Sequence, residues 1–161
     1  MDFQIGDRVV HCTHGLGQVL AIEERVINNN IALYYEVQIA DLSIWVPADE
    51  NLKSRLRFPI SEAGLKKLFS VLSGPAEKLP DDRRQRNLHL QEMLKDGKTE
   101  SLCKVIRDLA AYRRAASWNE YDTQLMKRVE KTLIREWSFI LSVPPQEAEV
   151  ELHRLLSHKM D

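Results

Sequence analysis

The sequence predicts an α+β protein in which a small antiparallel β-barrel precedes an all-helical domain. Up to Pro59, short apolar runs alternate with turn residues, and apolar side chains recur at every second position, as in half-buried strands. After Pro59 they recur every three or four positions, as on the buried face of a helix. A chain of 161 residues is long enough to give each part a core of its own.

Five strands are expected in the first part, near residues 7–12, 17–27, 32–39, 42–47 and 55–58. The clearest is ALYYEVQI, in which apolar residues from Leu33 to Ile39 occupy every second position. The run Asn28-Asn29-Asn30 is expected to join two strands, because asparagine tolerates the left-handed backbone of a hairpin turn. Five short strands with close turns favour a strongly bent barrel of the SH3-like or Tudor-like kind.

The second part is expected to begin with a connecting helix at residues 61–75. Ser61 can cap the start of this helix, and Gly74-Pro75 ends it. The predicted domains are therefore residues 1–60, which form the barrel, and residues 76–161, which form the helical domain, with the helix at 61–75 between them.

Four further helices are expected near residues 82–95, 100–115, 120–142 and 146–157. Asn119 and Asp122 have the spacing of a capping box at the start of the third of these helices. Pro145 suits the first turn of the last helix, where its missing N–H group has no intrahelical partner to lose.

The composition is that of an ordinary globular protein, with 43% hydrophobic and 29% charged residues. No apolar run approaches the roughly 18 residues of a membrane span, and no basic and then apolar leader opens the chain. Cys12 and Cys103 lie far apart, which favours the reducing cytosol over a disulfide framework. We therefore expect a cytoplasmic protein with no membrane partner.

Charge is distributed unevenly along the chain. Residues 1–60 contain five Lys/Arg and eight Asp/Glu, whereas residues 83–135 contain thirteen Lys/Arg and seven Asp/Glu. A mildly acidic first part and a basic middle predict two surfaces that bind different partners.

The segment His14-Gly15-Leu16-Gly17 could suggest a phosphate-binding loop or a metal site. A phosphate loop needs a longer glycine signature and a following helix, but a second strand follows here, which favours a tight turn. Strand alternation points His11 and Cys12 to opposite faces, and no further ligand pair completes a tetrahedral metal site. No motif fixes a catalytic constellation either, so we expect a protein that is not an enzyme and needs no cofactor or metal.

Trp45 is the most informative aromatic residue of the first part. In LSIWVP, alternation places Ile44 and Val46 on the face opposite to Trp45, so the indole is expected on the outside of the barrel. It could be second-layer core beneath a neighbouring helix, or it could anchor a protein contact, since tryptophan is enriched at binding hot spots. Arg25 and Ile27 share one face of their strand and could join that contact.

Basic residues cluster on three of the predicted helices. They are Arg83, Arg84, Arg86, Arg113, Arg114, Lys127, Arg128 and Lys131. Lys127, Lys131 and Arg135 recur every four residues, and only Glu130 is placed to pair with one of them. Each stripe alone could be a solvated helix face, but several in one helical group favour contacts with a phosphate backbone.

Several motifs of the chain resemble those of the CarD/CdnL family of bacterial transcription regulators, over essentially its whole length. The most specific are Gly6-Asp7-x-Val9-Val10, His14-Gly15-x-Gly17, Val46-Pro47 and Val105-Ile106-Arg107-Asp108-Leu109. The resemblance implies an N-terminal Tudor-like domain that binds the RNA polymerase β subunit. It also implies a C-terminal helical domain that contacts promoter DNA upstream of the −10 element and stabilises the open complex. The first part alone is also similar to the polymerase-binding domain of the transcription-repair coupling factor.

Transferred by this resemblance, the polymerase-binding positions are Arg25, Ile27 and Trp45, although the family often has arginine where Trp45 stands. The family usually places a tryptophan wedge at the minor groove where this chain has Arg83, and of the basic residues that follow only Arg86 is kept. An arginine cannot unstack bases as an apolar wedge does, although it can occupy a narrow minor groove.

The residues and the resemblance together predict a transcription regulator that binds the polymerase β subunit and promoter DNA and acts as a monomer. The alternative is a protein-only polymerase adaptor, whose helical domain binds another protein because the wedge is lost. Trp118, at the junction before the long helix, does not align with the wedge and is expected to pack at the start of that helix.

Overall fold

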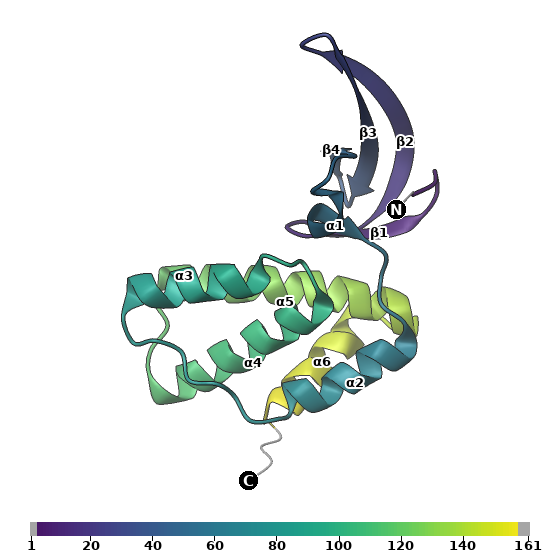
Figure 1. Cartoon of the computed structure of the whole chain (residues 1–161). Coiled ribbons are helices and arrows are strands. Elements are labelled where there is room, and N and C mark those ends of the chain that lie inside the picture. The colour runs from purple at the N-terminus through teal and green to yellow at the C-terminus, as the bar shows by residue number, and fades with distance from the viewer. Residues whose placement is uncertain (1–2, 158–161) are drawn as a thin grey trace. The chain divides into compact units, whose positions relative to one another are not determined.

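The computed structural model describes residues 3–157, and the chain divides into two compact units, Met1–Pro59 and Ile60–Asp161 (Figure 1). Each unit buries a hydrophobic cluster of its own. The predicted α+β class, a small antiparallel sheet followed by helices, is confirmed.

The first unit is a five-stranded antiparallel sheet in the order β4-β3-β2-β1-β5. Its strands are β1 (Arg8–His11), β2 (Gly15–Ile27), β3 (Asn30–Ile39), β4 (Leu42–Pro47) and β5 (Leu56–Arg57). The long strands β2 and β3 form the curved hairpin that Figure 1 shows, with an irregularity in register between Val19 and Ala21. The short helix α1 (Leu52–Arg55), which the sequence did not predict, leads into β5.

The asparagine run turns the chain between β2 and β3 as expected. Asn28 and Asn29 have φ angles of +52° and +66°, the left-handed values that a two-residue hairpin turn requires. Gly17 is needed for another reason, because β3 passes very close to it. A Cβ atom at this position would lie 2.5 Å from the carbonyl oxygen of Gln38, so only glycine fits without a shift of the backbone.

His11 closes the turn between β1 and β2. Its Nδ1 accepts hydrogen bonds from the backbone N–H groups of Thr13 (3.1 Å) and His14 (3.2 Å), and Gly15 follows with a φ of +87°. Burial of the ring, together with the nearby charges of His14 and Arg55, lowers the pKa of His11 from 6.5 to about 4. Since a protonated Nδ1 could not accept these bonds, the folded turn requires the neutral imidazole.

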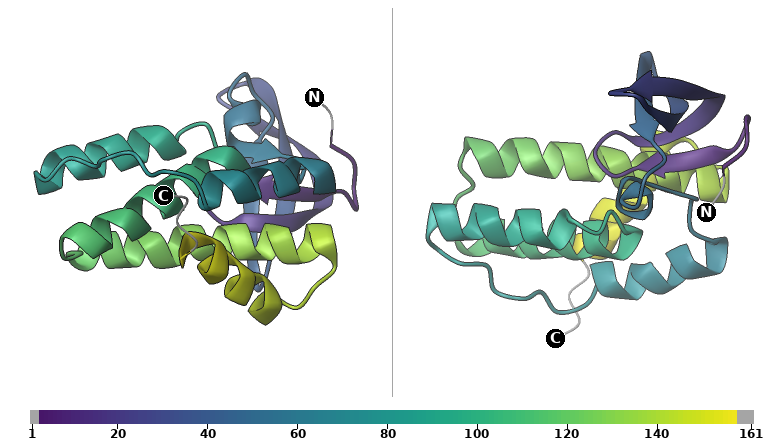
Figure 2. Two further views of the ribbon diagram at one scale, coloured as in Figure 1. Left: turned by 90° about the horizontal axis from the view of Figure 1, so that it is seen from below. Right: turned by 45° about the horizontal axis from the view of Figure 1, so that its top comes forward.

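The second unit contains α2 (Glu62–Leu72), α3 (Arg83–Leu94), α4 (Thr99–Ala115), α5 (Glu120–Leu141) and α6 (Pro145–Ser157). Helix α4 packs against α2, α3 and α5, while α6 packs against α5 and α2 (Figure 2). Every helix contributes to one core cluster, for example through Leu65, Leu90, Ile106, Leu133 and Leu152.

The helix boundaries follow the capping signals of the sequence. Ser61 Oγ accepts from the backbone N–H of Gly64 (3.0 Å), and Asn119 and Asp122 form the expected reciprocal capping box. Pro145 is the first residue of α6, as predicted. Helix α2, which we expected to be a connector, belongs to the helical unit, because Leu65 and the other apolar residues of its inner face lie in that core.

A pH-dependent stability of the first unit follows from His11. The unfolded chain protonates this ring near pH 6.5, so His11 contributes its full stabilisation above that pH and loses it as the pH falls through about 4. Because the ring is partly solvated, we expect a loss of about 1–2 kcal/mol. Urea unfolding followed by the amide NMR signals of Val9 and Val37, between about pH 4 and pH 7, measures it.

His11→Asn keeps an acceptor in the turn but removes the titrating group, and should flatten the pH dependence in this range. His89→Gln, which changes an exposed histidine of α3, serves as the matched control and should keep the wild-type slope. An unchanged slope in the His11 variant would contradict the assignment.

Candidate functional site

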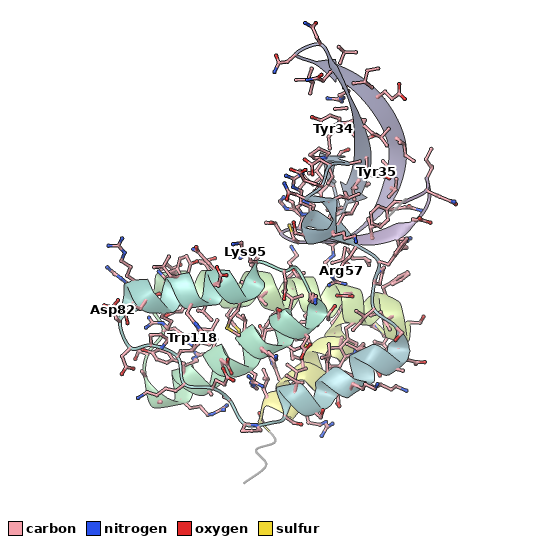
Figure 3. The ribbon with its side chains drawn as sticks, viewed as in Figure 1. Tyr34, Tyr35, Arg57, Asp82, Lys95 and Trp118 are labelled. Atoms are coloured by element: carbon pink, nitrogen blue, oxygen red, sulfur yellow. The ribbon has the colours of Figure 1, made fainter. Side chains whose placement is uncertain are left out.

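Three side chains from neighbouring strands meet on the outer face of the sheet. The guanidinium of Arg25 in β2 lies 4.3 Å from the ring centroid of Trp45 in β4 and 5.5 Å from that of Tyr34 in β3. We call Arg25, Tyr34 and Trp45 the aromatic patch. Tyr34, labelled in Figure 3, was not predicted for this site. Alternation with the buried Tyr35 places it on the outer face, but only the pairing of β2, β3 and β4 brings it to Arg25.

The orientation of Trp45 agrees with strand alternation. Val46 is buried in the core of the sheet and Ile44 packs against that core, whereas Trp45 is only partly buried. Among residues 3–157, Trp45 is assigned to neither hydrophobic cluster. The contact between Arg25 and the indole favours one arrangement of the two side chains, and the surface that they form is partly exposed.

Ile27 lies further along β2, at the end of the hairpin, and shares its face with Arg25. The opposite face of this end of the hairpin is apolar as well. Val26 and Ile31 oppose each other across the strands, and each is 73% exposed. Since β1 pairs only as far as Gln18 of β2, this part of the hairpin carries exposed apolar side chains and an open strand edge.

Arg83 and Arg84 are exposed in the first turn of α3, next to its N-cap residue Asp82, which Figure 3 labels. Both guanidinium groups can therefore reach an external phosphate. Arg86, one helical turn after Arg83, is instead buried.

The predicted role of Arg86 in DNA binding is wrong, because its side chain is buried, with 3% of the residue exposed. Its guanidinium donates through Nε to Asp122 Oδ1 (3.2 Å) and through Nη2 to Asp122 Oδ2 (2.9 Å). Nη1 donates to the carbonyl oxygens of Pro80 and Asp81 and to the hydroxyl of Tyr112. All three nitrogens of the guanidinium are thus engaged, and the hydrogen bonds to Asp122 raise the pKa of Arg86 further above its ordinary range. Arg86 lies four residues before Leu90 and therefore on the same face of α3. This spacing was the sequence signal that could have indicated its burial.

The remaining basic residues lie on α4 and α5. Arg113 and Arg114 are exposed in the last turn of α4, and Lys127, Arg128 and Lys131 are exposed along α5. Arg113, Arg114 and Lys127 line a common cleft, whereas Arg128 and Lys131 lie outside it.

Trp118 precedes α5 and is labelled in Figure 3. Its indole packs against the helical core, and its Nε1–H donates to the carbonyl oxygen of Leu109 (2.9 Å). The guanidinium of Arg113 lies 4.6 Å from the indole centroid. This tryptophan therefore belongs to the wall of the cleft and does not project as a wedge.

Both cysteines of the described residues are free thiols, with Cys12 partly exposed and Cys103 buried. Within residues 3–157, no group of three His, Cys, Asp or Glu side chains is arranged to hold a metal ion. Burial raises the pKa of the Cys103 thiol to about 12, so this cysteine is protonated at neutral pH. No helix in the described part of the chain is both long and apolar enough to cross a membrane.

Comparison with known proteins agrees with this architecture. Residues 3–59 match the family described as CarD-like/TRCF RID domain, and residues 67–153 match the family described as CarD, C-terminal domain. The chain is 24% identical over 148 residues to the "Putative transcription factor YdeB" of Bacillus subtilis (strain 168), which covers 90% of this chain and 96% of that protein.

The sheet unit and the helical unit thus define a two-part transcription factor with a domain for RNA polymerase interaction. The chain belongs to the CarD family, and the resemblance of its motifs to that family is confirmed.

The buried Arg86–Asp122 pair gives a stability prediction. Asp122→Ala leaves a buried guanidinium without its carboxylate and removes a side-chain cap of α5, so the free energy of unfolding of the helical unit should fall by about 3–5 kcal/mol. Urea unfolding followed by far-ultraviolet circular dichroism measures this loss.

Lys104→Ala breaks the exposed ion pair between Lys104 and Glu100 on α4 and is the matched control. It should change stability by less than about 1 kcal/mol. Similar losses of unfolding free energy in the two variants would show that the buried Arg86–Asp122 pair contributes no more to stability than the exposed pair.

Proposed function

We propose that this protein binds the RNA polymerase β subunit through its sheet unit and promoter DNA upstream of the −10 element through its helical unit, and so stabilises the open complex. The observation that carries the proposal is the aromatic patch, in which Arg25 is stacked on Trp45 on the outer face of a polymerase-interaction domain.

The aromatic patch has the chemistry of a protein-binding hot spot. Tryptophan, tyrosine and arginine are the residues most enriched at such spots, and all three are present. Because Arg25 already rests on two rings, little side-chain freedom is left to lose on binding. The exposed apolar end of the hairpin, which includes Ile27, can extend the contact around this centre.

The helical unit supports DNA contact through exposed cations. Arg83 and Arg84 stand at the N-terminus of α3, where the helix dipole also attracts phosphate. Arg113, Arg114, Lys127, Arg128 and Lys131 provide further positive charge on α4 and α5. Such contacts supply affinity with little sequence readout. With Arg83 at the wedge position, the protein would hold the groove by charge and would distort the duplex less than an apolar wedge does.

The proposed mechanism involves no chemistry and no cofactor. Binding to the polymerase raises the local concentration of the helical unit at the promoter, so its intrinsic DNA affinity can be low. A protein that binds the melted promoter better than the closed one shifts the equilibrium between the two states by its difference in affinity.

A protein-only adaptor is the second candidate. The observation that favours it is Leu88 on α3, which is 59% exposed and one turn from Arg84. An exposed leucine beside arginines suits a protein partner better than a phosphate backbone. In this case the helical unit would recruit another protein to the polymerase.

The polymerase contact predicts that Trp45→Ala weakens binding of the full-length protein to the isolated β subunit about tenfold or more, because a hot-spot anchor is lost. Biolayer interferometry measures the affinity. Leu42→Ala changes an exposed apolar residue on the opposite face of the same strand and should bind as the wild type does. Equal affinities for wild type and Trp45→Ala would remove Trp45 from the site.

The DNA contact predicts that the double variant Arg83→Ala/Arg84→Ala shortens the lifetime of the open complex several-fold. It should also lower the salt dependence of promoter binding by about one to two counterions. The control is Lys66→Ala/Lys67→Ala, which removes the same charge from exposed positions of α2. An unchanged lifetime with intact polymerase binding would favour the adaptor.

A further inference from the structure

A cleft of about 790 Å³ lies within the helical unit, where α4, α5 and α6 come together. Helix positions one turn apart supply its walls, such as Ala110 and Arg114 in α4 and Thr123 and Lys127 in α5. This volume is in the range of sites that hold cofactors and other small molecules.

The cleft is positively charged. Arg113, Arg114 and Lys127 line it, and within residues 3–157 none of them forms an ion pair with a carboxylate. Among residues 3–157, Glu130 is the one carboxylate that lines the cleft, and its Oε1 is 3.0 Å from Nε2 of His153 on α6. The Glu130 carboxylate is therefore hydrogen-bonded across the cleft to His153, and the three cationic side chains outnumber it.

The same cleft has an apolar wall. Met126 and Leu156 line it together with the indole of Trp118, whose orientation is fixed by the hydrogen bond to the Leu109 carbonyl. The guanidinium of Arg113 lies 4.6 Å from the centroid of that indole, so a cation is held next to the aromatic wall of the cleft. Fixed cations next to an aromatic wall suit a ligand with an anionic end and a flat apolar ring.

We propose that this cleft binds a nucleoside phosphate, with its base against the wall of Trp118, Met126 and Leu156 and its phosphates on Arg114, Lys127 and Arg113. Phosphate contacts to duplex DNA require only exposed cations and make no use of an apolar hollow. The hollow therefore distinguishes this site from the flat basic faces of Arg83, Arg84, Arg128 and Lys131. The proposal does not depend on polymerase binding, and it adds a small-molecule effector. Because Arg113, Arg114 and Lys127 are also among the cations of the proposed DNA contact, nucleotide and DNA would compete for them.

Isothermal titration calorimetry on the full-length protein tests this proposal with ATP and GTP as probes. Adenosine serves as a nucleoside without phosphates, and inorganic triphosphate serves as the phosphates alone. At least one nucleotide should bind at least tenfold more tightly than both adenosine and triphosphate. Arg114→Ala/Lys127→Ala should weaken that binding tenfold or more, whereas Arg83→Ala/Arg84→Ala, with the same loss of charge outside the cleft, should stay within about twofold of the wild type.

Ala110→Leu fills the cleft without changing its charge and should weaken nucleotide binding by a similar factor. Thermal unfolding by circular dichroism checks that the variants fold. If Arg114→Ala/Lys127→Ala does not fold, the single changes Arg114→Gln and Lys127→Gln replace it. The proposal is overturned if neither nucleotide binds at millimolar concentration, if triphosphate binds as well as the nucleotides, or if both double variants lose binding equally. It is also overturned if Arg114→Ala/Lys127→Ala loses only duplex DNA binding, which would assign the cleft to DNA.

Discussion

The helical unit depends on one buried ion pair. Arg86 from α3 and Asp122 from α5 form two hydrogen bonds with each other, and the remaining nitrogen of Arg86 binds the segment before α3 and the hydroxyl of Tyr112 on α4. Burying two charges has a large desolvation cost, and complete pairing with extra hydrogen bonds offsets it. An apolar pair could stabilise the same bundle equally well. The hydrogen bonds of the Arg86–Asp122 pair form, however, only when α3, α4, α5 and the segment before α3 are aligned in one way.

The same carboxylate connects the core to the functional surface. Asp122 Oδ2 also accepts from the backbone N–H of Asn119, so the anchor of Arg86 is part of the capping box that begins α5. The start of α5 therefore fixes Trp118 just before it and Lys127 just after it, and both line the basic cleft. At the other end of α5, the buried Glu136 accepts from the backbone N–H of Ile60 and from the hydroxyl of Thr99, which anchors the entry to the unit. The buried carboxylates of Asp122 and Glu136 thus hold the two ends of α5, the helix that carries the exposed Lys127.

Local rules predicted most of the fold, because strand alternation, asparagine turns and helix caps are each decided by a few neighbouring residues. The expected strands and helices agree with the structure to within a few residues, and both caps at Ser61 and Asn119 are present. The burial of Arg86 could not be read locally, since its partner lies 36 residues away and arginine is seldom buried. Tyr34 was missed because its role depends on the pairing of three strands, and α1 because four residues carry too weak a helical signal.

Under the proposed function, the two units would hold their partners by different physical interactions. The aromatic patch of the sheet unit contains one arginine, which lies over two rings, so its binding energy would come mainly from burying aromatic surface and would depend little on salt. The exposed arginines and lysines of the helical unit would bind DNA through counterion release, and such binding weakens steeply as salt rises. A regulator that relied on the second interaction alone would bind any DNA. Coupling it to a protein contact that depends little on salt would restrict the weak charge-driven binding to promoters that the polymerase already occupies.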